Sequence, residues 1–357
     1  MNMQTKCLLL ASLLVAVPLG ATPLVERVAT PNGGLVPDAE VDAVGNIHLA
    51  CVTGDNVFYT KSTDDGKTFS TPLRVNSEAG SAHPAGMFRG PDLAVAGNGQ
   101  VHVIWYNNAY QRKLPKDQWG VMYSHLNAGR TAFLPARNLS RKPGDNYSLA
   151  AGPGGELAVF WMAGGLFLNT SLDGGEKFSD PLAVAVADTC ECCASRAFFS
   201  GDGALHCAYR DKAGDQRDMY LLTRPRSRPG FEKEKISVTP WEIKGCPMTG
   251  TFLSGAKNGL VIAWETKGQV FYVRCDQNGR KTTVREIAVP GRGGKWPVAL
   301  AAPDGSVLVS WKKGAATEWQ MFGADDRPAG ELKSVPGKSP HRHAGVVTRT
   351  GNFLLID

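Results

Sequence analysis

The sequence predicts an all-β fold in which repeated sheets of about four strands close into a ring, and three observations support this prediction. Turn-forming residues are abundant, with 41 Gly and 22 Pro in 357 residues, and 43% of the chain is hydrophobic. One turn motif occurs twice. A short strand pattern recurs along the whole chain at intervals of about 46 to 56 residues, the length of one four-stranded blade. Together these features predict a β-propeller.

The repeated turn motif covers residues 62–69 (STDDGKTF) and 171–178 (SLDGGEKF), which both fit S-x-D-x-G-x-x-F. The Ser and Asp side chains can accept hydrogen bonds from backbone amides, and Gly supplies a positive φ. The aromatic ring would pack into the sheet. One copy alone would also suit an ordinary β-hairpin, but two copies in matching surroundings favour a repeated blade.

The recurring strand is an apolar, alternating segment that often ends in an aromatic residue. Its copies are 46–52 (NIHLACV), 100–106 (QVHVIWY), 156–162 (ELAVFWM), 204–210 (ALHCAYR), 259–265 (GLVIAWE), 306–312 (SVLVSWK) and 352–357 (NFLLID). Each opens a predicted second strand, and third strands follow at 56–61 and 165–170, for example. This count gives six complete blades and a partial seventh, which residues 24–29 would complete with an outer strand, so that both termini close the ring.

The N-terminus resembles a secretory signal. Lys6 precedes an apolar run from Cys7 to Val17, and small residues offer cleavage near Ala21, so we expect residues 1–21 to be removed and 22–357 to form one domain. A buried N-terminal helix is the alternative. The rest of the sequence contains no run of the roughly 20 apolar residues that a spanning helix needs. We therefore expect an exported protein, periplasmic or extracellular.

The net charge of +6 is spread along the chain without a dense basic tract, which disfavours nucleic-acid binding. A mild positive balance suits an acidic ligand, although it is equally compatible with a generic surface.

Propeller geometry places the candidate functional residues on one face. If the repeated turns lie on one face, the loops that lead into each innermost strand, and those that join second and third strands, lie on the other. These loops carry His83, Arg89, Tyr106, Tyr147, Cys190, Cys192, Cys193, Arg210, Asp211, Arg217, Asp218, Cys246, Glu265, Trp296, Lys312, His341, Arg342 and His343. We predict a ligand site there, with His83, Tyr106, Trp296, His341 and His343 among its binding residues.

The two S-x-D-x-G-x-x-F turns resemble the Asp-boxes (BNR repeats) of sialidase-superfamily propellers. That resemblance implies six blades, three arginines that clamp a substrate carboxylate, an Asp acid/base and a Tyr nucleophile. Residues 88–91 (FRGP) resemble the family's first arginine motif, so Arg89, Arg210 and Arg342 become the clamp candidates. No tyrosine follows Arg342, because the last one is Tyr272, so the nucleophile has no match.

Asp211 and Glu265 are the candidate acid/base pair, since glycosidases need two neighbouring carboxylates. The alternative is that both are solvated loop acids in ion pairs. The functional prediction is a propeller that binds, and in the catalytic interpretation hydrolyses, an acidic glycan as an exo-sialidase or related glycosidase. The alternatives are a non-catalytic ligand-binding propeller and a metal-binding protein.

The cysteine motif Cys190-Glu191-Cys192-Cys193 and the segment Gly245-Cys246-Pro247-Met248 lie in equivalent loops of consecutive blades, so they should meet. In an oxidising compartment we expect disulfides, for instance between Cys246 and one of the triplet, or a vicinal bond between Cys192 and Cys193. A soft copper or zinc site with the histidines is the alternative, and no metal is assigned.

The tryptophans divide into two groups. Trp105, Trp161, Trp264 and Trp311 end second strands and are predicted to pack between blades. Trp119 and Trp296 lie in loops of the ligand face and are candidates for stacking on a sugar ring.

Overall fold

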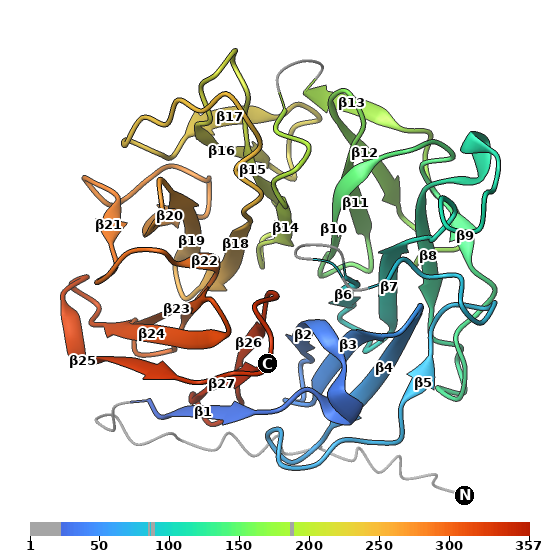
Figure 1. The fold of residues 1–357 in the computed structure, drawn as a ribbon, viewed down its shortest axis with the longest axis horizontal. Coiled ribbons are helices and arrows are strands. Elements are labelled where there is room, and N and C mark those ends of the chain that lie inside the picture. The colour runs from blue at the N-terminus through green and yellow to red at the C-terminus, as the bar shows by residue number, and fades with distance from the viewer. Residues whose placement is uncertain (1–22, 85, 87–89, 186–188) are drawn as a thin grey trace, which may run out of the picture.

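The computed structural model describes residues 23–84, 86, 90–185 and 189–357, and within these residues it shows seven sheets arranged radially around a central axis (Figure 1). Six sheets have four strands and the seventh has three. The prediction of an all-β propeller with six complete blades and a partial seventh is therefore confirmed. The predicted signal segment 1–21 and the clamp candidate Arg89 lie outside the described residues.

The strands follow the chain order from the axis outward in every four-stranded blade. Blades 1 to 3 consist of β2 (Leu35–Val41), β3 (Ile47–Thr53), β4 (Asn56–Ser62) and β5 (Leu73–Arg74); β6 (Asp92–Val95), β7 (Val101–Tyr106), β8 (Val121–His125) and β9 (Arg137–Asn138); and β10 (Asp145–Ala151), β11 (Leu157–Met162), β12 (Leu166–Ser171) and β13 (Leu182–Ala185).

Blades 4 to 6 consist of β14 (Arg196–Phe199), β15 (Leu205–Arg210), β16 (Met219–Arg224) and β17 (Glu232–Lys235); β18 (Thr251–Ala256), β19 (Gly259–Thr266), β20 (Gln269–Asp276) and β21 (Ile287–Ala288); and β22 (Lys295–Ala301), β23 (Val307–Lys313), β24 (Ala316–Phe322) and β25 (Pro328–Val335). The described helices are two short 3-10 turns, η1 (Pro31–Gly33) and η2 (Lys116–Gln118).

Blade 7 joins the two ends of the chain. It contains β26 (Ala344–Val347), β27 (Phe353–Ile356) and β1 (Val25–Val28), and β1 pairs in parallel with β27. The guanidinium of Arg27 lies 2.9 Å from the carboxylate of Asp357, which adds an ion pair to the backbone ladder. The N-terminal strand thus covers an edge of β27 that would otherwise be open to pairing with another chain.

The two S-x-D-x-G-x-x-F turns have the same hydrogen bonds. In the first, the Ser62 hydroxyl donates to Asp64 at 2.8 Å and accepts the amide of Gly66 at 2.9 Å. In the second, Ser171 makes the same two contacts with Asp173 and Gly175, again at 2.8 and 2.9 Å. The turns lie between third and fourth strands, as their residue types predict.

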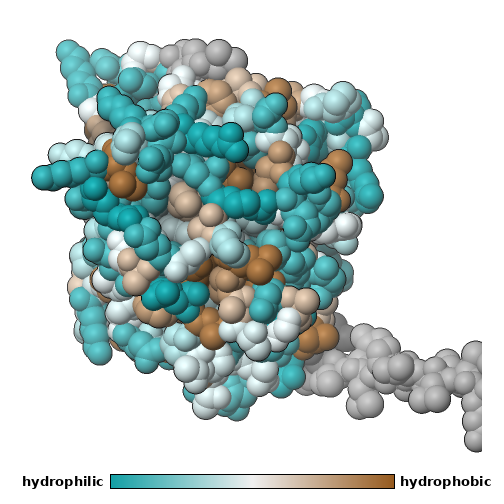
Figure 2. Space-filling view, turned by 90° about the vertical axis from the view of Figure 1, so that its right-hand side faces the viewer, coloured by the Kyte–Doolittle hydropathy of each residue, from teal (hydrophilic) through white to brown (hydrophobic). Residues whose placement is uncertain are grey.

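The core lies between neighbouring blades. Trp105, Trp161, Trp264 and Trp311 are at most 2% exposed and pack in clusters that draw residues from adjacent blades, as the sequence predicts. On the side of the molecule shown in Figure 2, hydrophobic residues form small separate groups among hydrophilic ones. Among the described residues, no helix is both long and apolar enough to cross a membrane.

Side chains also link the innermost strands around the axis. Asp38 of β2 accepts the amide of Leu93 in β6 at 2.8 Å, and Asp92 of β6 accepts the amide of Leu149 in β10 at 3.3 Å. The Ser148 hydroxyl then accepts the amide of Ala197 in β14 at 2.8 Å. These bonds satisfy inner-strand amides that have no partner within their own sheet.

Candidate functional site

A recess with a volume of about 750 Å³ lies on the face opposite the two S-x-D-x-G-x-x-F turns. We call it the disulfide pocket. Its lining comes from four loops of blades 3, 4 and 5: Gly164, Thr189, Cys190, Glu191, Cys192, Lys212, Gly214, Asp215, Arg217, Lys244, Gly245 and Cys246. These loops lead into innermost strands or join second to third strands, the two classes from which the sequence predicts a site. The volume falls in the range of about 300–1,000 Å³ typical of ligand sites.

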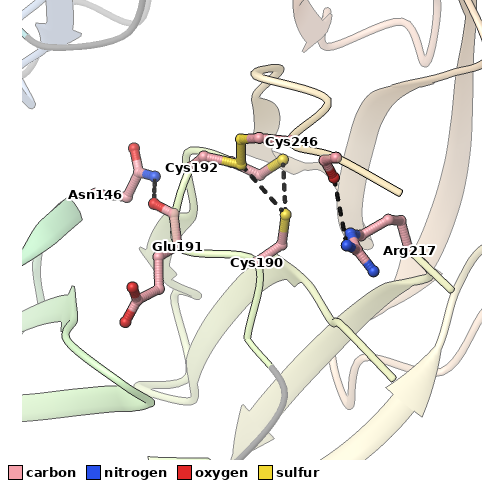
Figure 3. Close-up of a disulfide and its surroundings, with 8 residues drawn as sticks. Asn146, Cys190, Glu191, Cys192, Arg217 and Cys246 are labelled. Atoms are coloured by element: carbon pink, nitrogen blue, oxygen red, sulfur yellow. Dashed lines mark hydrogen bonds between the residues drawn. A yellow bond between two sulfur atoms is a disulfide. The ribbon is translucent and has the colours of Figure 1, made fainter. Parts of the chain in front are cut away.

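A disulfide between Cys192 and Cys246 joins the loop before β14 to the loop before β18, with 6.2 Å between the two Cα atoms (Figure 3). Cys190 and Cys193 remain free thiols. The Sγ atom of Cys190 lies 3.4 Å from that of Cys193 and 3.5 Å from that of Cys192. The predicted pairing of Cys246 with one of the triplet is thus present in the structure, and we call these four residues the cysteine cluster.

A buried guanidinium accompanies the two free thiols. Arg210 ends β15, is 1% exposed, and donates to the backbone carbonyls of Arg217 at 2.8 Å and of Glu265. The hydrogen bond from Cys190 and the positive charge of Arg210 lower the pKa of Cys193 to about 7, whereas the same hydrogen bond and burial raise the pKa of Cys190. The thiolate form is therefore favoured on Cys193.

The walls of the disulfide pocket are tied together by polar contacts. Arg217 donates to the carbonyls of Gly214 at 2.7 Å and Gly245 at 3.3 Å, joining the β15–β16 loop to the loop before β18. The Glu191 carboxylate accepts the amide of Gly164, and Asn146 donates to the Glu191 carbonyl. The Glu191 side chain points away from the sulfur atoms (Figure 3).

Asp211 and Glu265, the candidate acid/base pair, are buried and do not line the disulfide pocket. Asp211 is 8% exposed and forms an ion pair with Lys233 on the outer strand β17. Glu265 is 2% exposed, and its carboxylate accepts the amide of Gly268. Burial raises the pKa of Glu265, which favours the protonated acid. Their roles in catalysis stay a prediction.

A second charged group lies at the propeller axis. The Arg196 guanidinium lies 2.9 Å from the carboxylate of Asp38 and 3.0 Å from that of Asp92, and we call these three residues the axial cluster. Burial and the neighbouring Asp38 raise the pKa of Asp92 to about 7. Although burial alone would raise it, Arg196 holds the pKa of Asp38 below its ordinary value. The pair therefore takes up one proton as the pH falls through about 7.

The adjoining axial cavity has a volume of only about 40 Å³. Arg342, His343 and Trp296 line it, and Arg342 donates to the carbonyl of Pro91 at 2.5 Å. This volume holds a water molecule rather than a sugar. The axial cluster therefore stabilises the contact between the innermost strands β2, β6 and β14.

The other predicted ligand residues lie apart from the disulfide pocket. Arg342, Trp296 and His343 lie at the axis, while Arg210 is directed at backbone carbonyls. The amide of His83 donates to the carbonyl of Tyr106 at 2.8 Å. The His343 ring lies 2.7 Å from the Ser310 hydroxyl, and the described group with metal-ligand spacing contains cysteines only, without His341, His343 or His83.

Sequence reasoning missed the axial cluster, although a signal was present. Residues 37–41 (PDAEV) and 91–95 (PDLAV) repeat a Pro-Asp pair, which lies within β2 in the first case and at the beginning of β6 in the second. The shared position places Asp38 and Asp92 at the same level of the axis. Arg196 begins β14 and reaches both carboxylates.

No protein-family model matches the sequence, and no curated protein matches it. A protein of unknown function from Dyadobacter fermentans is similar in structure, with a TM-score of 0.53 and 15% identity over 85% of this chain and 95% of that one. A prolyl endopeptidase has a TM-score of 0.51 and 10% identity over 91% of this chain and 47% of that one.

A lectin from Aleuria aurantia, solved with a fucosylated saccharide, has a TM-score of 0.50 and 9% identity over 85% of this chain and 96% of that one. Sialidases and trans-sialidases are further structural neighbours, with TM-scores of 0.45 to 0.49. At these identities the comparisons establish the propeller fold alone. Any function must be argued from the site.

Proposed function

We propose that this protein is an exported binding propeller that takes an acidic saccharide, such as one ending in a uronic or sialic acid, in the disulfide pocket. The observation that carries the proposal is the excess of positive charge around this open, polar recess. Lys212, Arg217 and Lys244 line it against two carboxylates, Glu191 and Asp215. A saccharide carboxylate would meet cations on two sides, and its hydroxyls would meet loop carbonyls and amides.

The two lysines are available to a ligand. Lys212 and Lys244 are exposed, and within the described part of the chain neither has a carboxylate at ion-pairing distance. Glu191, by contrast, already accepts the amide of Gly164. Unpaired lysines beside a recess of about 750 Å³ are the expected feature of a site for a polar anion rather than for an apolar molecule.

Export is part of the proposal. The Cys192–Cys246 disulfide suits an oxidising compartment, and the N-terminal apolar run supplies the predicted signal. The lectin from Aleuria aurantia shares the propeller fold, which is why a saccharide site on such a ring is a reasonable expectation for this chain.

Isothermal titration calorimetry with glucuronate- and sialate-ended oligosaccharides, and with their neutral counterparts, tests the proposal. Lys212→Ala combined with Lys244→Ala should weaken binding at least tenfold, because a hydrogen bond to a charged group contributes about 1.5–3 kcal/mol. Lys257→Ala is the matched control, since Lys257 is an exposed lysine in the β18–β19 turn of the opposite face. Equal affinity for neutral and acidic saccharides, or equal loss in the control, would contradict the proposal.

Hydrolysis is the second candidate, favoured by the raised pKa of Glu265 beside Arg210. A fluorogenic sialoside or glucuronide would be cleaved by the wild-type protein and not by Glu265→Gln. Saccharide binding without any cleavage would leave the binding function alone.

A further inference from the structure

We propose that Cys190 and Cys193 hold one Cu(I) ion between their thiolates while the Cys192–Cys246 disulfide stays intact. This would be a metal site separate in chemistry from the saccharide function, although it borders the same pocket. It requires no reductant for the protein, because both ligand thiols are already free in the structure.

The geometry brings two free thiols face to face. Their Sγ atoms are 3.4 Å apart, and the residues are 3% and 1% exposed. The sulfur of Cys192 completes a group of three whose Sγ atoms all lie within 4.8 Å of one another. Two Cu–S bonds to one ion would require the two free side chains to rotate slightly apart from their separation of 3.4 Å. Because both residues are nearly buried, solvent has little access to an ion held between them.

The charge balance also favours a monovalent ion. The buried Arg210 guanidinium donates to carbonyls, and in the described residues no carboxylate lies at ion-pairing distance from it. One Cu(I) with two thiolates carries a net charge of −1, and the buried guanidiniums of Arg210 and Arg217 offset this negative charge. The site therefore avoids the large cost of an uncompensated buried anion.

The number of free thiols in the cysteine cluster favours Cu(I) over zinc. Thiolates favour Cu(I), zinc and iron–sulfur clusters, and structural zinc needs four ligands in a tetrahedron. The disulfide occupies Cys192 and Cys246, so two thiolates remain in the cluster. Cu(I) is stable with two thiolate ligands. On loading, two Cu–S bonds form, the thiol protons pass to solvent, and no atom changes oxidation state.

The ion has a route to the site. Cys190 lines the disulfide pocket, which opens to solvent on the ligand face, whereas Cys193 lies behind it. The structure therefore assigns Cys190 as the first free thiol of the cysteine cluster that an entering ion meets.

The test uses the full chain with its disulfide intact, under anaerobic conditions. Cu(I) is supplied in acetonitrile, and bicinchoninate competes for it. We expect one Cu(I) retained per chain, and none in Cys190→Ser or Cys193→Ser. Cys51→Ala is the matched control, because Cys51 is a buried free thiol in blade 1 and its loss should leave the stoichiometry at one.

A measurement on the wild-type chain covers the case in which a serine variant does not fold. Peptide mapping after alkylation in mild denaturant should show Cys190 and Cys193 protected by Cu(I), with Cys51 and Cys207 labelled as in the metal-free protein. Failure of the wild type to retain Cu(I) against bicinchoninate would overturn the proposal. So would a native Cys190–Cys193 disulfide, because it would leave no thiolates for the ion.

Discussion

Replacing Arg196 by Met should destabilise the propeller more than the loss of any surface charge. The guanidinium lies 2.9 and 3.0 Å from two carboxylates whose side chains are 7% and 3% exposed. Removing one partner of a buried charged group leaves the others uncompensated, and such changes cost about 3–5 kcal/mol. Met keeps the length and the apolar stem of the side chain. The loss of unfolding free energy in Arg196→Met therefore measures the effect of removing the positive charge rather than the effect of lost packing.

The pH dependence of this loss follows from the two carboxylates. Without Arg196, the folded-state pKa of Asp92 rises further above its unfolded value near 3.9, and the pKa of Asp38 is no longer held below that value by the guanidinium. The penalty is then largest above pH 7 and shrinks as the pH falls toward 4, by up to about 1.4 kcal/mol per pH unit for each proton taken up.

Urea unfolding followed by tryptophan fluorescence at pH 5 and pH 8 measures the loss of unfolding free energy in Arg196→Met and its dependence on pH. Arg228→Met is the control, because Arg228 and its partner Glu232 form an exposed pair that should contribute about 0–1 kcal/mol. Asp38→Asn and Asp92→Asn added to Arg196→Met should recover part of the loss, since the two carboxylates closest to Arg196 then carry no charge. A loss below about 1 kcal/mol, or an equal loss at both pH values, would refute the reasoning.

Three further predictions concern the disulfide, one turn and the buried histidines. Cys192→Ala with Cys246→Ala should lower the free energy of unfolding by about 4 kcal/mol in the loop-entropy model, since the cysteines are 54 residues apart; an unchanged Tm would contradict this. Gly175→Ala should lower the free energy of unfolding by at least about 2 kcal/mol, because Gly175 has φ +87° and a Cβ would lie 1.8 Å from the Tyr123 hydroxyl. Gly54→Ala is the control and should cost about 1 kcal/mol, because Gly54 has φ +58° and open space around it. Equal denaturation midpoints for the two variants would show the reasoning to be wrong. Burial lowers the pKa of His206 to about 4, so its stabilising contribution is present above pH 6.5 and is lost as the pH falls toward 4. His206→Gln should therefore reduce the slope of the unfolding free energy against pH, between pH 4 and 6.5, by about 1.4 kcal/mol per pH unit. An unchanged slope would contradict the lowered pKa of His206.

The elements that depend on local pattern could be predicted from sequence. The strand expected at 204–210 is β15 (Leu205–Arg210), and the one expected at 352–357 is β27 (Phe353–Ile356). Short, mostly apolar runs predict such strands, because every residue of β15 and β27 is buried. The two S-x-D-x-G-x-x-F turns were also predictable, since their hydrogen bonds involve residues only a few positions apart.

The direction of individual side chains could not be predicted in the same way. Arg210 was expected to face a ligand, but it ends a strand at a point where two backbone carbonyls lie within reach, and it turns inward to them. The axial cluster depends on residues 104 and 158 positions apart, and only the closed ring brings them together. The meeting of Cys192 and Cys246 was predictable because equivalent loops of consecutive blades are neighbours.

A crystal structure of the protein with a bound uronate- or sialate-ended oligosaccharide tests the central claim most directly. We predict the saccharide carboxylate within hydrogen-bonding distance of the Lys212 and Lys244 ammonium groups, above the Cys192–Cys246 disulfide. Saccharide density at another part of the ring, or an empty disulfide pocket at a saturating concentration of each acidic sugar, would contradict the account.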